Sequence, residues 1–263
     1  MTGEKAAVVK RAARAGADVA LEGFRSDLAI TTKEGKTDVV TQADRNAQDR
    51  VIEVIREAYP DEPIVGEEAD ALKSVPEEGP AWVIDPIDGT NNYVRDMRFW
   101  TTSVAAVVDG EPIAAANILP AESDTFVADA DDTRLNETSV SVSERTDPET
   151  FTVVPTIWWG FDERDEYAAA CREIVTRFGD LSRYGSVQGT LALIAAGSIE
   201  GTITNVEPKP WDTIAGVHLV RQAGGVVTDL EGDPWTYAST GLVASNGTAH
   251  DEVLAAARGI EGR

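Results

Sequence analysis

Two carboxylates, Asp85 and Asp88, stand three positions apart directly after a short apolar run at residues 82–84. The apolar run predicts a buried strand, and we expect this strand to end on Asp85 because Pro86 has no N–H to continue a ladder. Carboxylate oxygens are among the ligands that Mg²⁺ prefers in proteins. The pattern therefore predicts a metal site at the end of this strand.

Gly89 and Thr90 extend the motif toward a phosphate site. Glycine permits unusual backbone angles, and Thr90 is expected to be the N-cap of a helix that begins at Asn91. The free N–H groups of a helix N-terminus bind anions such as phosphate. An acidic turn that merely caps a helix is the alternative. It is less favoured because two acids, a glycine and a threonine coincide at the end of one apolar strand.

Haloacid-dehalogenase-type phosphatases also end a strand in an acidic motif followed by Gly-Thr, but the spacing excludes them. Their nucleophilic aspartate stands two residues before the second aspartate. In this chain that position is Pro86, which carries no nucleophile. The aspartyl-phosphate mechanism is therefore excluded, and the metal-ligand interpretation is retained.

The composition is that of a globular chain. Its 263 residues, 42% of them hydrophobic, are enough for one large domain or two closely packed ones. No run of about 18 apolar residues predicts a membrane span, and residues 1–14 lack the apolar core of a signal peptide. The single cysteine, Cys171, excludes an internal disulfide and is expected to be a small core residue. These features predict a protein of the reducing cytoplasm.

Acidic residues outnumber basic ones, 46 to 23, which gives a formal net charge of −23. Lysine is scarce, and an acid-rich, lysine-poor surface suggests adaptation to high intracellular salt. An ordinary acidic surface is the alternative. Phosphate backbones bind basic patches and none is visible, so nucleic acid is not expected as a partner. A small anionic substrate would need local positive charge, which a bound metal ion could supply.

The hydrophobic patterns predict an uneven succession of helices and strands. Helices are expected over 4–24, 42–59, 165–178, 187–196, 211–223 and 250–258, and strands over 64–65, 101–108, 112–119, 125–130, 151–157, 180–184, 201–205, 226–228 and 241–244. Residues 30–40 are expected to form a mobile loop or hairpin. The chain turns polar over 134–148, so we place a boundary near 145, between units 1–145 and 146–263. This succession predicts an α+β fold of layered, mixed sheets.

Three further motifs accompany the segment from Asp85 to Thr90. They are Lys36 to Asp44 before the second predicted helix, Gly66-Glu67-Glu68 after a short strand, and Lys209-Pro210-Trp211-Asp212 at the start of a later helix. Together the four motifs resemble the inositol monophosphatase family, from about residue 36 to 247. Each motif is weak by itself, and their joint order makes the signal strong. The resemblance implies the sugar-phosphatase fold, an α/β/α/β/α sandwich.

The resemblance also implies Mg²⁺-dependent hydrolysis of phosphate monoesters without a covalent intermediate. Two to three ions would be bound, with Mn²⁺ as a substitute. Glu67, Asp85 and the Ile87 carbonyl would hold the first ion, and Asp85, Asp88 and Asp212 the second. A third, weaker ion would lie near Glu67. Two neighbouring ions can activate water on one side of the phosphorus and stabilise the leaving oxygen on the other.

The implied catalytic residues are Asp44, Thr90 and Glu67. Asp44 and Thr90 would orient the attacking water, and the Gly89 and Thr90 N–H groups would bind phosphate. Lys36 would lie on a lid loop near the phosphate, although a solvated loop lysine is as good an interpretation. Glu68 and Asp38 remain alternative ligands, and neither histidine, His218 nor His250, lies in a metal or triad pattern.

The residues expected to contact the substrate do not identify which phosphate ester is hydrolysed. Arg183 and Ser186 lie in the segment that borders the substrate's sugar ring in this family. Asn205 stands where animal-type inositol phosphatases carry a glutamate, and Lys209-Pro210 replaces their His-Cys. These departures resemble archaeal and bacterial relatives that also hydrolyse fructose 1,6-bisphosphate. Inositol phosphate and fructose bisphosphate remain equal candidates, and dual use is open.

Two other functions stay open from the sequence. One is a nucleotide phosphatase acting on 3′-phosphoadenosine or NADP phosphates, for which no base-stacking contacts are identified. The other is a metal-binding regulatory protein on the same fold, which the retention of Thr90 and Asp44 disfavours. The resemblance further implies a homodimer, inhibition by Li⁺, and a small phosphorylated polyol or sugar as the substrate. From hydropathy and charge, no membrane and no nucleic acid is expected as a partner.

Overall fold

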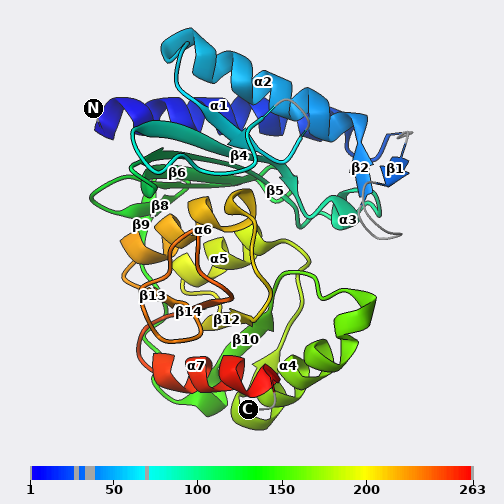
Figure 1. The fold of residues 1–263 in the computed structure, drawn as a ribbon, viewed down its shortest axis with the longest axis vertical. Coiled ribbons are helices and arrows are strands. Elements are labelled where there is room, and N and C mark those ends of the chain that lie inside the picture. Colours follow the sequence, from blue (N-terminus) through cyan, green and yellow to red (C-terminus); the bar gives the residue numbers. More distant parts are fainter. Residues whose placement is uncertain (1, 27–29, 33–38, 69–70, 262–263) are drawn as a thin grey trace.

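Five layers make up the fold: helices, sheet, helices, sheet, helices (Figure 1). The computed structural model describes residues 2–26, 30–32, 39–68 and 71–261. The α+β class and the layered sandwich of mixed sheets expected from the sequence are confirmed. Among the described residues, no helix is long and apolar enough to cross a membrane.

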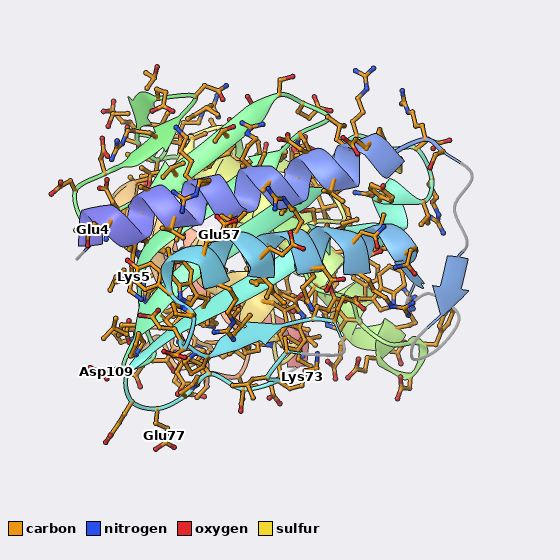
Figure 2. The ribbon with its side chains drawn as sticks, turned by 90° about the horizontal axis from the view of Figure 1, so that it is seen from above. Glu4, Lys5, Glu57, Lys73, Glu77 and Asp109 are labelled. Atoms are coloured by element: carbon orange, nitrogen blue, oxygen red, sulfur yellow. The ribbon has the colours of Figure 1, made fainter. Side chains whose placement is uncertain are left out.

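The first layer consists of α1 (Thr2–Gly23) and α2 (Gln42–Ala58). They lie side by side over one face of the larger sheet, as the view from above shows (Figure 2). Between them the chain forms the antiparallel pair β1 (Ile30–Thr32) and β2 (Val39–Thr41). Gly16 marks the close approach of the two helices, because a Cβ there would lie 2.4 Å from a Val51 methyl.

The second layer is a seven-stranded sheet with the strands in sequence order. All neighbouring strands are antiparallel except the first pair, β3 and β4. The strands are β3 (Ile64–Gly66), β4 (Pro80–Asp88), β5 (Thr101–Val108), β6 (Glu111–Leu119), β7 (Asp124–Ala128), β8 (Thr133–Leu135) and β9 (Thr138–Val140). The short helix α3 (Thr90–Tyr93) follows β4. The hairpin of β8 and β9 was not predicted, because its residues are mostly polar.

The prediction that the strand ends on Asp85 is wrong. β4 runs on through Pro86 to Asp88, with a register shift between Asp85 and Asp88. The missing proline N–H falls within this irregularity, where no ladder hydrogen bond is needed. The Pro86 carbonyl instead accepts a bond of 2.8 Å from the Thr102 hydroxyl on β5. The bulge thus keeps Asp85 and Asp88 at the end of β4, where Asp88 contacts the start of α5.

The third layer, α5 (Val187–Ala195) and α6 (Pro210–Gln222), lies between the two sheets. Both helices pack on the larger sheet, and both contact strands of the smaller one. Their apolar side chains join residues from both sheets in one buried cluster, which includes Val83, Leu191, Val220 and Ala244. The core is therefore continuous across residue 145, and a division into units there remains a proposal.

The fourth layer is a five-stranded mixed sheet in the order β11-β10-β12-β14-β13, and α4 and α7 cover its outer face. The elements are β10 (Thr152–Pro155), α4 (Arg164–Arg177), β11 (Asp180–Leu181), β12 (Gly201–Thr204), β13 (Val226–Thr228), β14 (Leu242–Ser245) and α7 (His250–Arg258). Single 3₁₀ turns occupy Pro148–Thr150, Phe161–Glu163 and Gly259–Glu261. β11 is shorter than predicted, since the chain leaves the sheet after Leu181 to reach the site.

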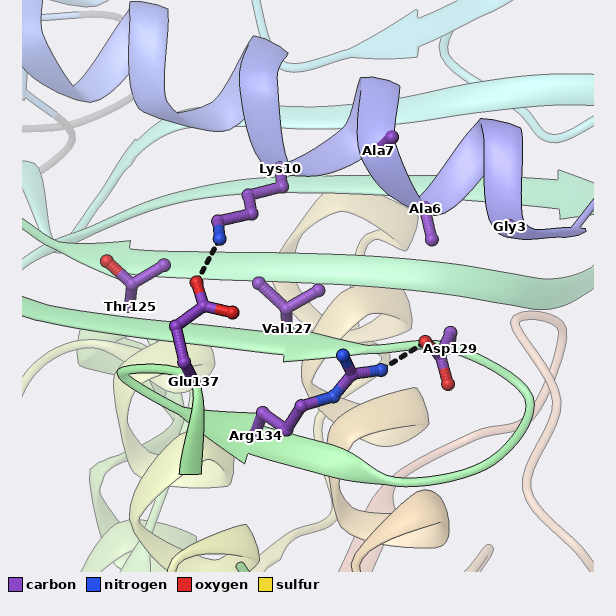
Figure 3. Close-up of a pocket in the computed structure, with 9 residues that line it drawn as sticks. All are labelled: Gly3, Ala6, Ala7, Lys10, Thr125, Val127, Asp129, Arg134 and Glu137. Carbon is purple, nitrogen blue, oxygen red and sulfur yellow. Dashed lines mark hydrogen bonds and ion pairs between the residues drawn. The ribbon is translucent and has the colours of Figure 1, made fainter. Parts of the chain in front are cut away.

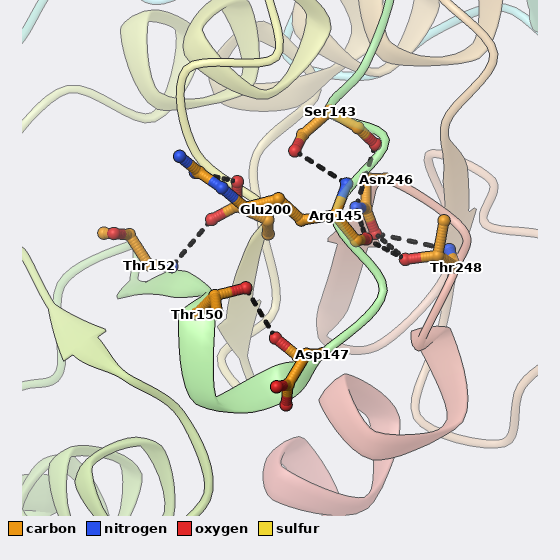
Figure 4. A network of polar contacts seen from close by, with 8 residues as sticks. All are labelled: Ser143, Arg145, Asp147, Thr150, Thr152, Glu200, Asn246 and Thr248. Atoms are coloured by element: carbon orange, nitrogen blue, oxygen red, sulfur yellow. Dashed lines mark hydrogen bonds and ion pairs between the residues drawn. The ribbon is translucent and has the colours of Figure 1, made fainter.

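The segment that connects the two sheets is fixed by a buried carboxylate (Figure 4). Glu200, with no exposed surface, accepts hydrogen bonds from Arg145 Nη1 at 2.8 Å and from the Thr152 N–H at 2.7 Å. Asn246 Nδ2 donates to the carbonyls of Ser143 and Arg145, at 3.0 and 2.9 Å. These contacts fasten residues 143–152 to the smaller sheet.

A cavity of about 200 Å³ lies between α1 and the far strands of the larger sheet (Figure 3). Thr125 and Val127 of β7 line it, and Lys10 pairs with Glu137 at its mouth. Phe126, between the two lining residues, packs on the opposite face among the residues of α5 and α6. The cavity is therefore on the other side of the sheet from Asp85 and Asp88, whose partners come from that third layer.

Candidate metal and phosphate site

Three carboxylates converge where β4 meets the third layer. Asp85 and Asp88 come from the last part of β4, and Asp212 comes from the first turn of α6. One oxygen from each lies within 4.8 Å of the others, which is the spacing of ligands around shared cations. Hard carboxylate oxygens fit Mg²⁺ or Mn²⁺. The donor set of this chain thus fits the metal ions that the sequence predicts.

Asp88 is held by the start of α5. Its Oδ2 accepts hydrogen bonds from the Ser186 hydroxyl and from the Gln188 N–H, the latter at 2.6 Å. Ser186 is also the N-cap of α5, since its hydroxyl accepts from the Gly189 N–H at 3.0 Å. Burial raises the pKa of Asp88 to about 6, although these hydrogen bonds act in the opposite direction. The fold thus orients this carboxylate through neutral donors and pairs it with no positive side chain among these contacts.

Asp85 stands among other carboxylates. Burial raises its pKa well above the usual range, and the negative charges of Glu67, Asp88 and Asp212 raise it further. Its Oδ1 accepts one hydrogen bond of 3.1 Å from the Ile87 N–H. The pKa of Asp212 is raised in the same way, by burial first and then by Asp88 and Glu67. A cation bound among them would remove the repulsion that raises these pKa values.

Asp212 is directed by the N-terminus of its helix. Its N–H donates to the Lys209 carbonyl at 3.1 Å, and its Oδ2 accepts from the Lys209 N–H at 3.3 Å. Pro210 is the first residue of α6, a position where its missing N–H costs nothing. Lys209 itself is exposed, and its charge partly lowers the pKa of Asp212.

Thr90 links the phosphate motif to α2. Its hydroxyl lies 3.0 Å from the Ile87 carbonyl and 3.2 Å from Oδ1 of Asp44, which is 1% exposed. The prediction that Thr90 caps the helix is wrong. Gly89 is the N-cap, with φ 96°, and Thr90 is the first helical residue. A Cβ at Gly89 would lie 3.1 Å from the Gly185 carbonyl, so glycine is required there for backbone angle and for space.

The loop after β3 brings Glu67 toward the carboxylates, as its effect on the pKa values of Asp85 and Asp212 shows. Lys73 fixes this loop by donating to the carbonyls of Gly66, Glu67 and Glu68, each at 2.8 Å. The Glu68 N–H donates to Gln48 Oε1 of α2, at 2.9 Å. Lys73 also lies 5.4 Å from the Trp211 ring centre, which connects the loop to the residue before Asp212.

The residues expected on the substrate side have mixed surroundings. Ser186 is buried against Asp88 and Thr101. Asn205 uses both ends of its amide within the protein, accepting from Trp159 Nε1 at 2.8 Å and donating to Glu166 at 2.6 Å. Arg183 is half-buried.

Arg183 also places its guanidinium 5.6 Å from the centre of the Trp158 ring. Lys36 and Asp38 lie outside the described residues.

Sequence reasoning missed Gln188 and Lys73. Gln188 ends the segment that begins at Arg183, where no role is predicted for it, and Lys73 lies outside the motifs. A lysine or glutamine that bonds backbone carbonyls leaves no pattern in one sequence. The histidines behave as structural residues. His218 is buried in α6 with its pKa lowered to about 4 by burial, and His250 bonds Ser245 and Thr228 through its two ring nitrogens.

Comparison with known proteins decides the family. The model of the inositol monophosphatase family matches residues 4–262. The chain belongs to the inositol monophosphatase family. It is 33% identical to a protein of Pasteurella multocida named Nus factor SuhB, over 93% of this chain and 92% of the relative. It is 32% identical to the fructose-1,6-bisphosphatase/inositol-1-monophosphatase of Aquifex aeolicus, over 95% of this chain and 94% of that protein.

Among solved structures, the IMPase of Thermotoga maritima superposes with a TM-score of 0.88 at 28% identity, covering 100% of this chain and 99% of that one. Membership in this family makes the protein a phosphoric monoester hydrolase that acts on phosphorylated substrates. The family is metal-dependent, and Asp85, Asp88 and Asp212 form an acidic cluster that could hold a metal ion.

Proposed function

We propose that the protein is a Mg²⁺-dependent phosphomonoesterase that hydrolyses inositol monophosphate, fructose 1,6-bisphosphate or both. The observation that carries this proposal is the convergence of Asp85, Asp88 and Asp212 from two distant segments. Near them, the Thr90 hydroxyl donates a hydrogen bond to Asp44. The net charge of −23 disfavours nucleic acid as a partner, whereas bound metal ions would supply the local positive charge that a small polyol or sugar phosphate needs.

The metal ligands we propose are those of the sequence analysis. Glu67, Asp85 and the Ile87 carbonyl would hold one Mg²⁺, and Asp85, Asp88 and Asp212 a second. A third ion would lie near Glu67. Bound Mg²⁺ supplies positive charge to the phosphate oxygens and lowers the pKa of coordinated water. Mn²⁺ is expected to substitute, because it takes the same oxygen ligands.

Thr90 and Asp44 are proposed to orient the attacking water, with Glu67 as the third catalytic residue. The Thr90 hydroxyl lies between the Ile87 carbonyl and Asp44, so Asp44 can receive a proton that passes through this hydroxyl. The N–H groups of Gly89 and Thr90 precede the first N–H bonded within α3, that of Asn92. We propose that they bind the phosphate of the substrate.

The exposed Lys209 and the half-buried Arg183 are proposed to contact the rest of the substrate. Either cation would suit the second phosphate of fructose 1,6-bisphosphate. Asn205 and Ser186 are proposed to act indirectly, since their polar atoms bond protein groups. Lys36 remains the proposed lid residue.

The experiment is phosphate release with Mg²⁺ from myo-inositol 1-phosphate, fructose 1,6-bisphosphate and adenosine 3′,5′-bisphosphate. We expect release from one or both of the first two. Arg183→Gln and Lys209→Gln should raise KM for the bisphosphate more than for the monophosphate. Li⁺ is expected to inhibit by competing with one Mg²⁺. Release from none of the three esters, despite Mg²⁺ binding, would contradict the proposal and favour a metal-binding regulatory role.

One observation favours the nucleotide as a second candidate substrate. The Trp158 ring is 46% exposed and lies beside Arg183. The Arg164 guanidinium contacts both this ring and that of Phe161, which is 76% exposed. Exposed rings beside guanidinium groups can stack on a nucleobase. If the nucleotide is the substrate, Trp158→Ala should lower kcat/KM for adenosine 3′,5′-bisphosphate by at least tenfold and leave inositol phosphate unchanged.

A homodimer is also proposed, as the resemblance implies. Size-exclusion chromatography with light scattering would measure it directly. A mass of about 28.1 kDa would show a monomer and contradict it.

A further inference from the structure

Gln188 lies at the contact between the two halves of the acidic cluster. It is the second residue of α5 and has no exposed surface. Its main-chain N–H donates to Asp88 Oδ2 at 2.6 Å, so the backbone of this residue fixes one of the three carboxylates. A glutamine is costly to bury unless its amide is fully bonded, so its side chain needs an explanation of its own.

The side chain of Gln188 reaches across to α6. Its Nε2 donates to the Trp211 carbonyl at 2.6 Å, and its Oε1 accepts from the Gly216 N–H at 2.7 Å. Trp211 immediately precedes Asp212. One residue therefore bonds Asp88 through its main chain and the first turn of the Asp212 helix through its side chain.

Gly216 allows this contact to be short. A Cβ at Gly216 would lie 2.6 Å from Leu191 Cβ and 2.9 Å from Gln188 Oε1. Both distances are below any real Cβ contact, so any larger residue would push α5 and α6 apart. The separation of the two helices is therefore set where the amide of Gln188 bridges them.

The same amide is bonded to the larger sheet. Asn117 Nδ2 of β6 donates to Gln188 Oε1 and to the Gln188 carbonyl, both at 3.0 Å. Asn117 is paired with Ser103 across β5 and β6, and Ser103 is paired with Asp85 across β4 and β5. A row of polar residues thus leads from Gln188 across the sheet to the third carboxylate.

We propose that Gln188 is a positioning residue that sets the spacing of Asp85, Asp88 and Asp212 for metal binding. It is not a metal ligand, because its amide atoms bond Trp211, Gly216 and Asn117. The inference rests on the proposed metal-dependent function of this cluster. Groups that orient metal ligands without touching the metal typically contribute about 10- to 100-fold to metal affinity.

The test uses Gln188→Met, which keeps the length of the side chain and removes its hydrogen bonds. The matched control is Gln222→Met at the last residue of α6, the helix that the Gln188 side chain contacts through its first turns. The Kd of Mn²⁺ is measured without substrate, by electron paramagnetic resonance of the free ion. We expect Gln188→Met to raise this Kd about 10- to 100-fold, with Gln222→Met unchanged. The Mg²⁺ concentration for half-maximal phosphate release should rise in parallel, with KM for the ester at saturating Mg²⁺ little changed.

A second variant covers the case in which Gln188→Met does not fold. Gln188→Asn keeps an amide but is one methylene too short to join α5 and α6, so it should also weaken Mn²⁺ binding by at least tenfold. A folded variant of either kind with lowered Tm and an unchanged Kd for Mn²⁺ would overturn the inference, since a merely structural residue would behave so. If the wild type binds Mn²⁺ but hydrolyses no ester, the proposed function fails. The change in Kd would still test the positioning role.

Discussion

The molecule buries carboxylates in two places and treats them in opposite ways. Glu200 lies immediately before β12 of the smaller sheet with Arg145 and the Thr152 N–H as partners, so its charge is matched by a cation and by a backbone dipole. Asp85 is equally buried, but its neighbours are Glu67, Asp88 and Asp212, whose charges raise its pKa.

The difference separates a structural carboxylate from a functional one. A buried charge that the fold itself neutralises holds chain segments together, as Glu200 does for residues 143–152. A group of like charges held together by the fold is costly, and folding alone would not retain it. The cost is explained if the cluster binds cations, which makes the acidic cluster the functional site and Glu200 part of its scaffold.

The largest predicted effect concerns the cluster. Asp88→Asn should lower phosphate release by on the order of 10³-fold or more at saturating Mg²⁺, because it removes a proposed metal ligand at the reacting phosphate. The fold should persist, since an asparagine oxygen can still accept from Ser186 and Gln188. Steady-state phosphate assays and circular dichroism measure the two properties. Asp61→Asn, at an exposed position, is the control. Wild-type turnover in Asp88→Asn would refute the metal assignment.

The opposite result is expected at the structural carboxylate. Glu200→Gln should lower the free energy of unfolding by about 2 kcal/mol, because charge-assisted bonds to Arg145 and Thr152 are lost. For a chain of this size that is a fall in Tm of about 4–8 °C. Turnover below the transition should match the wild type, and the exposed Glu77→Gln should change neither property. Loss of turnover in folded Glu200→Gln would abolish the distinction between the two places.

The pH dependence of the metal-free protein sharpens the comparison. The pKa of Asp88 is raised to about 6 from 3.8, so between these values the folded protein keeps a proton that the unfolded chain has lost. Its contribution to stability therefore falls as pH rises through this window and stays low above it. Asp88→Asn does not titrate, so in EDTA at pH 8 it should be more stable than wild type, by on the order of 1–3 kcal/mol.

This advantage should disappear near pH 4. Titration of His218, whose lowered pKa makes stability fall as pH drops below the usual histidine range, is common to both proteins and cancels in the difference. Urea unfolding of both proteins at a series of pH values measures this difference in the free energy of unfolding. If the extra stability of Asp88→Asn did not vary with pH, the charge of Asp88 would not be what destabilises the metal-free wild type.

The smallest effect is expected at the surface. If the net charge of −23 is an adaptation to salt, molar KCl should raise Tm by a few degrees, through screening of repulsion worth about 1 kcal/mol. Wild type and Asp88→Asn should gain equally, because buried charges are screened much less than exposed ones. Differential scanning fluorimetry from 0.1 to 3 M KCl checks this, and full stability at low salt would contradict the adaptation.

The sequence predicted the parts of the molecule that repeat a local pattern. The 3.6-residue period gave α2 to within one residue at its end, and the motif order led to Asp85, Asp88 and Asp212, which do converge. What it missed depends on distant neighbours. Pro86 continues a strand because a bulge accommodates it, and the Ser186 hydroxyl is committed to Asp88, 98 residues away. Gln188 bonds three other elements, and no local pattern encodes such contacts.

The bond between Asp88 and Ser186 also bears on how the chain is made, because its ends are separated by 98 residues. At ordinary rates of synthesis of about 5–20 residues per second, the ribosome adds that length in roughly 5–20 s. During this interval β4 exists without the helices that direct its carboxylates. The site of three carboxylates is therefore complete only after α5 and α6 have been made and have packed on the larger sheet.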